Sequence, residues 1–375
     1  MSKKIAFLFG AWSCAARPLD FNCLWSSPRG LTGSDLGITE TAKYFAKKGH
    51  DISLFTVYAN DQQPETWEGV KLRKIENKGS EITEDFDAVI SWSEPDILRD
   101  LPKKPIKVVC QMLNDFNYCQ PGFDDAVDIW TAPCQRLIDH LMTFPNALSR
   151  DKFFVVPLGC ERAWYSDQRV PGRIVFTSSA DRGLFNLLQI YSKIKKAVPY
   201  AELRIFYHYS YSDVEKMEPT SNNPPHLREL GQRARYDKEM VKKLEHLGVS
   251  RIGSISRDRM KQELSEASVF AYPCQPVLFS EGFSLSTAEA MSSYTVPIIS
   301  DADCLGSIYE NSGAIVIKDI ANNLEQFTDE VIKSLIDKNY ADEIIEKCLK
   351  WTNEYTWKKS AEKLEEVIKN GIKSK

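Results

Sequence analysis

The sequence predicts an α/β protein made of two doubly wound domains, each built on a mainly parallel sheet. Short apolar runs alternate with helical patterns, which is typical of successive β–α–β units. This alternation occupies the first half of the chain and starts again near residue 173. A length of 375 residues also favours two domains over one. We expect the two sheets to face each other across a cleft, with ligands outside the carboxyl ends of the strands.

The first half of the chain predicts one sheet with its helices. The first strand is expected at residues 5–9, followed by a long loop and a helix at residues 38–48. Gly49 comes next, and glycine is the residue that most often ends a helix in the left-handed conformation. Further apolar runs predict strands at residues 50–56, 88–91, 108–110, 128–131 and 154–157.

The second half repeats this order. It predicts strands at residues 173–177, 202–207, 269–272 and 296–300, and helices at residues 184–197, 240–246 and 287–291. We expect residues 208–239 to be a surface excursion, and residues 356–373 to be a charged amphipathic helix. Because Asp167, Pro171 and Gly172 interrupt both patterns, the predicted parts are residues 1–165, 166–355 and 356–375.

The composition excludes several classes of protein and of site. A net charge of -4 provides no basic field over the whole protein, so no nucleic-acid partner is expected. Nine widely spaced cysteines without a C-x-x-C pair, and five histidines, argue against a structural zinc site and for reduced thiols in the cytoplasm. No stretch approaches the roughly 20 apolar residues of a membrane span. Lysines and arginines near both ends leave peripheral membrane contact open.

The most informative segment covers residues 279–291, because it holds two carboxylates at a loop-to-helix junction. Glu281 and Glu289 lie eight positions apart, and a helical pattern starts near the second. Backbone amides at such a helix N-terminus suit a diphosphate, and a carboxylate can accept hydrogen bonds from vicinal hydroxyls. Spacing alone equally allows a solvated Glu281 and a helix-capping Glu289. Between the two carboxylates lie further candidate ligand-binding residues: Gly282, Phe283, Ser284, Leu285 and Ser286.

The same segment carries a family resemblance. Read as E-G-F-S-L-S-T-A-E-A-M, residues 281–291 resemble the E-G-F-G-x-x-x-x-E-A-M element of retaining GT-B glycosyltransferases, especially family 4. Further segments resemble the family in the same order over nearly the whole chain: Gly33 with the following helix, K-G-H-D at 48–51, V-P-L-G-C-E at 156–161, D-R-G-L at 181–184, I-G-S-I at 252–255, T-V-P-I-I-S at 295–300 and Y-T-W at 355–357.

The resemblance implies a fold and roles for individual residues. The fold would be GT-B, with two Rossmann-like domains, the acceptor on the N-terminal one, the donor on the C-terminal one, and the last helix packing back toward the N-terminal domain. The catalytic candidates are Glu281, for the hydroxyls of the donor sugar, and Arg182, for the diphosphate. Glu289 would bind the nucleotide ribose. Gly33 would let the backbone approach the diphosphate, and Ser254 would lie beside the base. A solvated turn arginine and an ordinary turn glycine remain the alternatives for Arg182 and Gly33.

Three positions depart from the family pattern. Where the family has an arginine in a G-R-L segment, this chain has Thr177, so phosphate binding would rest on Arg182 and on donors near Ser178 and Ser179. The second glycine of E-G-F-G is a serine here. The histidine that many members carry after an N-terminal-domain strand is missing, and Asn114 or its neighbour Asp115 is the candidate for a related contact.

Two further loops bear on the acceptor and on metal binding. The loop 10–32 exceeds the usual two to six residues of a strand-to-helix connection, and its tryptophans and arginines make it the candidate acceptor side. Asp301-Ala302-Asp303 follows an apolar strand, which is how GT-A glycosyltransferases hold a divalent cation. Because it falls in a variable loop of the GT-B pattern, we expect these aspartates to be solvated or capping. No metal and no cofactor is expected besides the nucleotide-diphosphate sugar as co-substrate.

The implied reaction is hexosyl or pentosyl transfer with retention of configuration. The acceptor would be a hydroxyl of a glycan, a glycoprotein or a lipid-linked molecule. Two other functions stay open at this point: a GT-B sugar-nucleotide epimerase, for which no acid and base residues can be named, and a catalytically silent GT-B binding subunit.

Overall fold

A computed structural model describes residues 2–10, 18–75, 81–110, 122–144, 148–161, 169–207 and 224–374. The chain forms two compact units. The first comprises Met1–Ser27, Leu31–Gly159 and Tyr355–Lys375, and the second comprises Pro28–Gly30 and Cys160–Glu354. The second unit thus begins at Cys160, ahead of the boundary predicted at residues 165 and 166, and the C-terminal helix is part of the first unit.

The first unit contains an eight-stranded sheet in the order β3-β4-β2-β1-β5-β6-β7-β8. Neighbouring strands are parallel except for the hairpin of β3 with β4 at one edge. Without that hairpin strand, the order is that of a doubly wound sheet, as predicted. The strands are β1 (Lys4–Phe9), β2 (Asp51–Thr56), β3 (Thr66–Trp67), β4 (Val70–Lys74), β5 (Ala88–Trp92), β6 (Ile106–Cys110), β7 (Ile129–Ala132) and β8 (Phe153–Val155).

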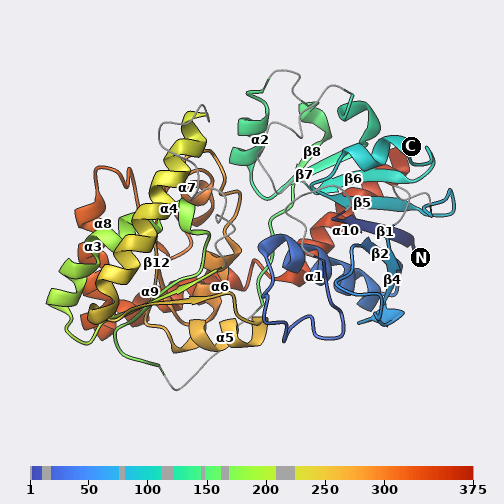
Figure 1. Ribbon diagram of the computed structural model, residues 1–375. Helices are drawn as coiled ribbons and strands as arrows, with labels where there is room; N and C mark the ends of the chain where they lie inside the picture. The colour runs from blue at the N-terminus through green and yellow to red at the C-terminus, as the bar shows by residue number, and fades with distance from the viewer. Residues whose placement is uncertain are drawn as a thin grey trace. The chain divides into compact units, whose positions relative to one another are not determined.

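Among the described residues of this unit, three α-helices accompany the sheet: α1 (Gly33–Lys47), α2 (Gln135–Leu141) and α10 (Trp357–Ser374). The start of α1 is fixed by Thr32 and Asp35, whose side chains each accept a hydrogen bond from the other's backbone N–H. Helix α10 packs against α1 and β6 (Figure 1), which confirms the predicted return of the C-terminal helix to the N-terminal domain. Short 3-10 helices lie at Asp96–Asp100, Asp124–Ala126 and Arg150–Lys152.

The second unit contains a six-stranded, fully parallel sheet in the order β11-β10-β9-β12-β13-β14. Counted along the chain, this is the order 3-2-1-4-5-6 of a Rossmann sheet, whose direction of winding reverses between β9 and β12. The strands are β9 (Arg173–Phe176), β10 (Glu202–Phe206), β11 (Val249–Gly253), β12 (Val269–Tyr272), β13 (Val296–Ser300) and β14 (Ile315–Ile317).

Seven α-helices belong to the part of this unit that the structure describes: α3 (Leu184–Ala197), α4 (Pro225–Leu244), α5 (Arg257–Glu266), α6 (Leu285–Ser292), α7 (Leu305–Tyr309), α8 (Leu324–Ile336) and α9 (Lys338–Thr352). Short 3-10 helices, η6 (Ala180–Arg182) and η7 (Glu245–Leu247), precede α3 and follow α4. Among the described residues, none of the helices is long and apolar enough to cross a membrane.

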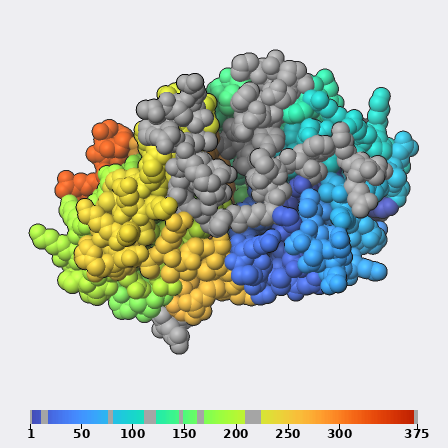
Figure 2. Space-filling view, viewed as in Figure 1, coloured from blue at the N-terminus to red at the C-terminus, as the bar shows by residue number. Residues whose placement is uncertain are grey.

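Helix α4 is longer than the sequence pattern predicted. The expected surface excursion at 208–239 is wrong for its second part, because the helix starts at Pro225 rather than near residue 240. Proline is well suited to the first helical turn, where its missing N–H is not needed. The helix is surface-exposed (yellow in Figure 2) and strongly polar, so few apolar residues mark it in the sequence. Residues 208–223 lie outside the described part of the chain.

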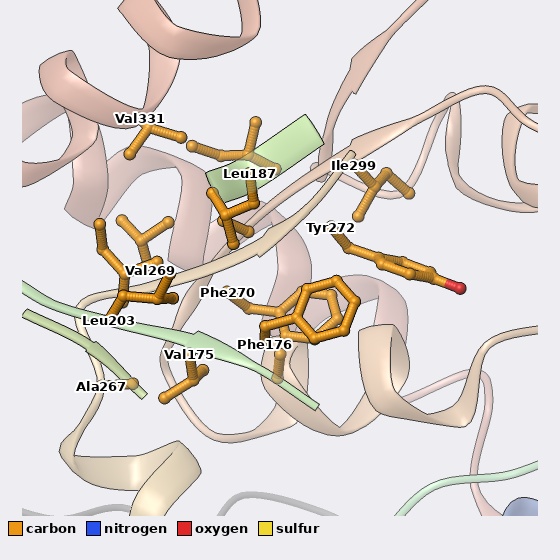
Figure 3. Close-up of a cluster of buried hydrophobic side chains, with 14 of the residues drawn as sticks. Val175, Phe176, Leu187, Leu203, Ala267, Val269, Phe270, Tyr272, Ile299 and Val331 are labelled. Atoms are coloured by element: carbon orange, nitrogen blue, oxygen red, sulfur yellow. The ribbon is translucent and has the colours of Figure 1, made fainter. Parts of the chain in front are cut away.

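The core of the second unit is formed by the apolar faces of the sheet and its helices. Central β9 and β12 contribute continuous buried runs, as expected for parallel strands covered on both faces. Figure 3 shows Phe176, Phe270 and Tyr272 together at one end of this core. The rings of Phe176 and Phe270 each lie edge-on or tilted to Tyr272, with centroids 5.8 and 5.9 Å away. This packing fixes the ends of the two strands that border the candidate site.

Candidate functional site

The candidate site lies at the carboxyl ends of β9 and β12, where the winding of the second sheet reverses. Thr177, Ser178 and Ser179 follow β9 and lead into η6, which ends at Arg182. The chain that leaves β12 after Tyr272 runs through Glu281 to α6. In an open parallel sheet this reversal leaves a crevice outside the strand ends, which is where ligands bind.

Glu281 is held by donors from both strand ends. Its side chain is buried, with the residue 5% exposed. Oε2 accepts a hydrogen bond of 2.6 Å from the Tyr272 hydroxyl and one of 3.1 Å from Nη1 of Arg182. Ser178 Oγ donates to the Tyr272 hydroxyl oxygen at 3.0 Å. The structure therefore brings two of the predicted residues, Arg182 and Glu281, into direct contact.

Arg182 is the cation of this group. Its side chain is 30% exposed, and burial by itself would lower its pKa. Glu281 and the other acidic groups around it together outweigh this and hold the pKa well above the ordinary value. Among the described residues, no acceptor reaches the buried Nε. Arg233 of α4 donates to the carbonyl oxygens of Asp181 and Gln275, which ties the turn bearing Arg182 to α4. A fixed, permanently charged guanidinium at this edge suits an anion.

The D-x-D aspartates support the Glu281 loop. Oδ2 of Asp303 accepts hydrogen bonds from the backbone amides of Ser280 and Glu281, at 2.7 and 2.8 Å. Burial raises the pKa of Asp303 more than these amides lower it. Asp301 Oδ1 accepts from the backbone amide of Asp319 at 3.1 Å. Both carboxylates thus cap backbone amides, in agreement with the capping alternative.

Glu289 lies on α6 and forms a buried ion pair. Its Oε1 contacts Nη2 of Arg257, and both residues are 5% exposed. Arg257 is the first residue of α5, and Ser256 caps that helix by accepting from the Arg259 amide. The sequence analysis missed Arg257 as well as Tyr272. Tyr272 is the last residue of a predicted strand, and Arg257 follows the I-G-S-I segment at 252–255, so neither residue carried a signal of its own.

The N-terminus of α6 is anchored to β9. Ser284 caps the helix in the left-handed conformation, with φ of +62°, which glycine adopts without strain and which explains the family glycine at this position. The Tyr309 hydroxyl donates to the Ser284 carbonyl oxygen at 3.0 Å, and Ser286 Oγ donates to the Thr177 carbonyl oxygen at 3.1 Å. Thr287 bonds Ser284 through its amide, whereas the amides of Leu285 and Ser286 precede the first bond of the helix and are available to an anion.

The other predicted residues lie at different places. Gly282 and Phe283 are buried in the same loop, and Phe283 packs its ring 6.1 Å from that of Tyr309. Ser179 bonds its own turn at Asp181. Ser254 follows β11 on the far side of β10, away from the group around Glu281.

The residues predicted from the N-terminal half belong to the first unit or lie outside the described residues. Gly33 is the first residue of α1, in the first unit. Asn114, Asp115, Trp12 and Arg17 lie outside the described residues. Trp25 of the predicted acceptor loop packs its ring 5.9 Å from that of Trp67, within the first unit.

Each candidate carboxylate keeps one oxygen without a donor in the part of the chain that the structure describes. For Glu281 this is Oε1, because Tyr272 and Arg182 both contact Oε2. For Glu289 it is Oε2, because Arg257 contacts Oε1. An acceptor oxygen held in place and left without a donor can take a ligand hydroxyl.

A family comparison identifies the region that contains this group. Residues 179–351 match the sequence model of the family described as Glycosyl transferases group 1. This part of the chain is therefore similar to the group 1 glycosyl transferases. The matched region includes Arg182, Glu281, Arg257 and Glu289. A search of curated protein sequences finds no match.

Solved structures of similar fold extend over the whole chain. A sucrose-phosphate synthase from Thermosynechococcus elongatus superposes with a TM-score of 0.70 at 13% identity, covering 100% of both chains. A glycosyltransferase from Rickettsia africae gives 0.70 at 14% identity, again over 100% of both chains. HepE from Anabaena, in complex with UDP and glucose, gives 0.66 at 11% identity over 98% of this chain and 100% of its own. The chain thus has the GT-B fold, as predicted.

Proposed function

We propose that this protein is a retaining glycosyltransferase that moves a sugar from a nucleotide-diphosphate sugar to a hydroxyl of a glycan, glycoprotein or lipid-linked acceptor. The observation that carries the proposal is that two buried carboxylates are each paired with an arginine at one oxygen and keep the other oxygen as an acceptor. Glu281 is paired with Arg182, and Glu289 with Arg257. A diphosphate flanked by two polyhydroxylated rings has the matching groups: an anion between two sets of hydroxyl donors.

The proposed roles follow the positions of these groups. Arg182 and the first amides of α6 bind the diphosphate, since a guanidinium and a helix N-terminus both favour oxyanions. Oε2 of Glu289 accepts from the ribose. Oε1 of Glu281 accepts from a hydroxyl of the transferred sugar.

In the proposed reaction, the bond from the anomeric carbon to the phosphate oxygen breaks while the bond to the acceptor oxygen forms on the same face. The acceptor's proton goes to the departing phosphate oxygen. The protein orients both substrates and stabilises the charge that develops on the diphosphate. Glu281 contacts the sugar in this scheme and is not its nucleophile.

We also propose that turnover needs no divalent cation. The positive charge that a leaving diphosphate requires comes from Arg182 and the α6 amides. Asp303, the second aspartate of the D-x-D segment, already accepts hydrogen bonds from two backbone amides. We propose the cytoplasm as the location, because nine widely spaced cysteines fit reduced thiols.

The test of this function is donor turnover in a panel of nucleotide sugars with excess EDTA. UDP-glucose comes first, because HepE holds UDP and glucose. We expect release of nucleoside diphosphate from at least one donor, and an anomeric product of unchanged configuration by NMR. No binding of any nucleotide sugar by calorimetry would contradict the proposal, and an inverted product would contradict retention.

Two glutamine variants test the division of roles. Glu289→Gln should weaken the free nucleoside diphosphate and the intact donor alike, because the ribose is common to both. Glu281→Gln should leave the nucleoside diphosphate affinity within about threefold and lower donor turnover by tenfold or more, since a charged hydrogen bond contributes about 1.5–3 kcal/mol. Equal loss of diphosphate affinity in both variants would show that the roles are not divided.

The metal proposal needs a matched variant. Because Asp303 holds the Glu281 loop, replacing it with alanine would damage the loop as well as any cation site. The double variant Asp301→Ala/Asp303→Asn keeps an amide oxygen for the Ser280 and Glu281 N–H groups and removes both carboxylates. We expect it to retain activity in EDTA. Activity that EDTA abolishes, that manganese restores and that this variant lacks would contradict metal independence.

A further inference from the structure

Tyr272 stands at the carboxyl end of β12, where its ring and its hydroxyl have different surroundings. The side chain is fully buried, and the ring packs against Phe176 and Phe270. Figure 3 shows the hydroxyl oxygen pointing away from these apolar side chains. It reaches the Glu281 carboxylate at 2.6 Å. The core thus holds the ring rigidly while its one polar atom contacts the candidate site.

The direction of the hydrogen bonds at this hydroxyl follows from the partners. A carboxylate accepts but does not donate, so the single phenolic proton of Tyr272 is committed to Glu281. Ser178 must then donate to the phenolic oxygen, over 3.0 Å. Burial raises the pKa of Tyr272 well above its ordinary value, with Cys274 and Glu281 adding to this, so the hydroxyl stays protonated at neutral pH. The result is a directed chain from Ser178 through Tyr272 to Glu281.

Arg182 donates to the same oxygen of Glu281 as Tyr272 does, but in the proposed function it also binds the diphosphate. If the arginine turns to the diphosphate, as the proposed function requires, Tyr272 becomes the remaining side-chain donor to Glu281 among the described residues. A carboxylate fixed by one short hydrogen bond keeps its other oxygen aimed in one direction. Without that bond, the side chain would turn freely and could reform its pair with Arg182.

We propose that Tyr272, oriented by Ser178, is a positioning residue that holds Glu281 in the orientation needed to bind the donor sugar. This inference rests on the proposed function of Glu281. It assigns to Tyr272 no contact with substrate. Its effect must therefore appear in the recognition and turnover of the sugar donor, and must depend on the presence of the Glu281 carboxylate.

The variant Tyr272→Phe removes the hydroxyl and keeps the ring. We expect kcat/KM for the donor to fall about tenfold to hundredfold, as for the loss of one hydrogen bond to a charged group, while the affinity for free nucleoside diphosphate changes less than about threefold. Ser178→Ala, which removes only the orienting bond, should lower kcat/KM by a smaller factor. The matched control is Tyr191→Phe, because Tyr191 is equally buried in the same unit and donates to backbone carbonyl oxygens instead.

A double variant separates positioning from general damage. In the Glu281→Gln background, Tyr272→Phe should add less than about twofold to the loss, because the carboxylate through which it acts is already gone. A Tyr272→Phe variant as active as wild type, or one whose full loss persists in that background, would overturn the inference while leaving the proposed function intact. A wild-type protein that binds and turns over no nucleotide sugar would overturn both.

Discussion

Two sets of buried glutamates in this molecule differ in how completely they are bonded. Glu263 on α5 is 1% exposed, and both of its oxygens accept from arginines: Oε2 from Arg204 at 2.8 Å, and Oε1 from Arg204 and Arg259 at 2.7 Å. Glu281 and Glu289 are almost as buried, yet each has only one bonded oxygen among the described residues.

Glu365 of α10, in the first unit, belongs with Glu263. His50 and Lys369 contact its Oε1, and Lys48 donates to its Oε2 at 2.6 Å. A carboxylate with both oxygens bonded stabilises the fold and has little left for a ligand. A buried carboxylate that is half bonded carries a desolvation cost that a ligand can offset. Counting bonded oxygens therefore separates the structural glutamates from the candidate binding glutamates.

The largest expected effect is a loss of stability when a fully bonded glutamate, Glu263, is replaced. Glu263→Gln leaves arginines facing a neutral amide, and removing one partner of a buried ion network costs about 3–5 kcal/mol of unfolding free energy. We expect such a loss by urea denaturation, while the nucleoside diphosphate affinity of the remaining folded protein stays unchanged. The matched variant Glu281→Gln should show the opposite result, with stability nearly kept and donor turnover lost. Similar stability losses in both would remove the distinction.

The stabilisation of the fold by Glu365 should depend on pH. Burial alone would raise its pKa, but the hydrogen bonds from Lys369, Lys48 and His50 lower it to about 2. Because the folded-state pKa lies below the ordinary value, this stabilisation is present above about pH 4.5 and is lost as the pH falls toward 2. The shift corresponds to about 3 kcal/mol.

The variant Glu365→Gln provides the measurement. Its unfolding free energy should lie about 2–3 kcal/mol below that of wild type at pH 7, and the difference should shrink between pH 4.5 and 3. Glu366→Gln serves as the control, because Glu366 pairs only with Lys363 on the exposed face of α10 in the described structure. A stability difference that is the same at pH 7 and pH 3 would show that the ionic contacts of Glu365 contribute little.

Arg182→Ala tests one of the two half-bonded glutamates, because Arg182 donates a hydrogen bond to Glu281. The residue is partly exposed, so we expect the unfolding free energy to change by less than about 1 kcal/mol, since exposed or partly exposed pairs contribute little. Nucleoside diphosphate affinity should fall by about 1.5–3 kcal/mol, the contribution of a hydrogen bond between charged groups. Calorimetry with UDP and a melting curve give both numbers. Unchanged UDP affinity would place the diphosphate elsewhere.

The smallest expected effect concerns the cap of α6. Ser284→Gly relieves the left-handed conformation of a non-glycine residue but removes the side-chain oxygen that accepts from the Thr287 amide, at 3.3 Å. These contributions oppose each other, and we expect a net change within about 0.5 kcal/mol in thermal unfolding and little change in donor KM. A marked gain in donor affinity would show that the serine narrows the sugar pocket.

Most strands could be predicted closely because parallel strands are read as buried apolar runs. β12, β13 and α3 have the predicted bounds. No strand was predicted at β3, β4, β11 or β14, which are short or partly exposed. Helices α8 and α9 were missed although both are amphipathic, and most of α4 was missed because few of its residues are apolar. The sequence signal is thus strongest where a strand is fully buried.

In the candidate site, the family motif predicted the individual residues but not the residues with which they form hydrogen bonds. Glu281, Glu289 and Arg182 followed from the resemblance, and the pairing of Arg182 with Glu281 agrees with that selection. Tyr272 was read only as the end of a strand, because apolar spacing does not reveal where a tyrosine hydroxyl points. Arg257 lies 32 residues before Glu289, and no local pattern connects the two. Such pairings depend on the order of strands in the sheet.

The chain order of the two units has a consequence for synthesis on the ribosome. Helix α10 packs on α1 and β6, yet all of Cys160–Glu354 separates it from them in the sequence. The N-terminal unit therefore emerges first and must leave the α10-facing sides of α1 and β6 uncovered while the second unit is translated and folds. The unit that is made first is completed last, and during that interval its exposed apolar surface is the part of the nascent chain most open to chaperones and to aggregation.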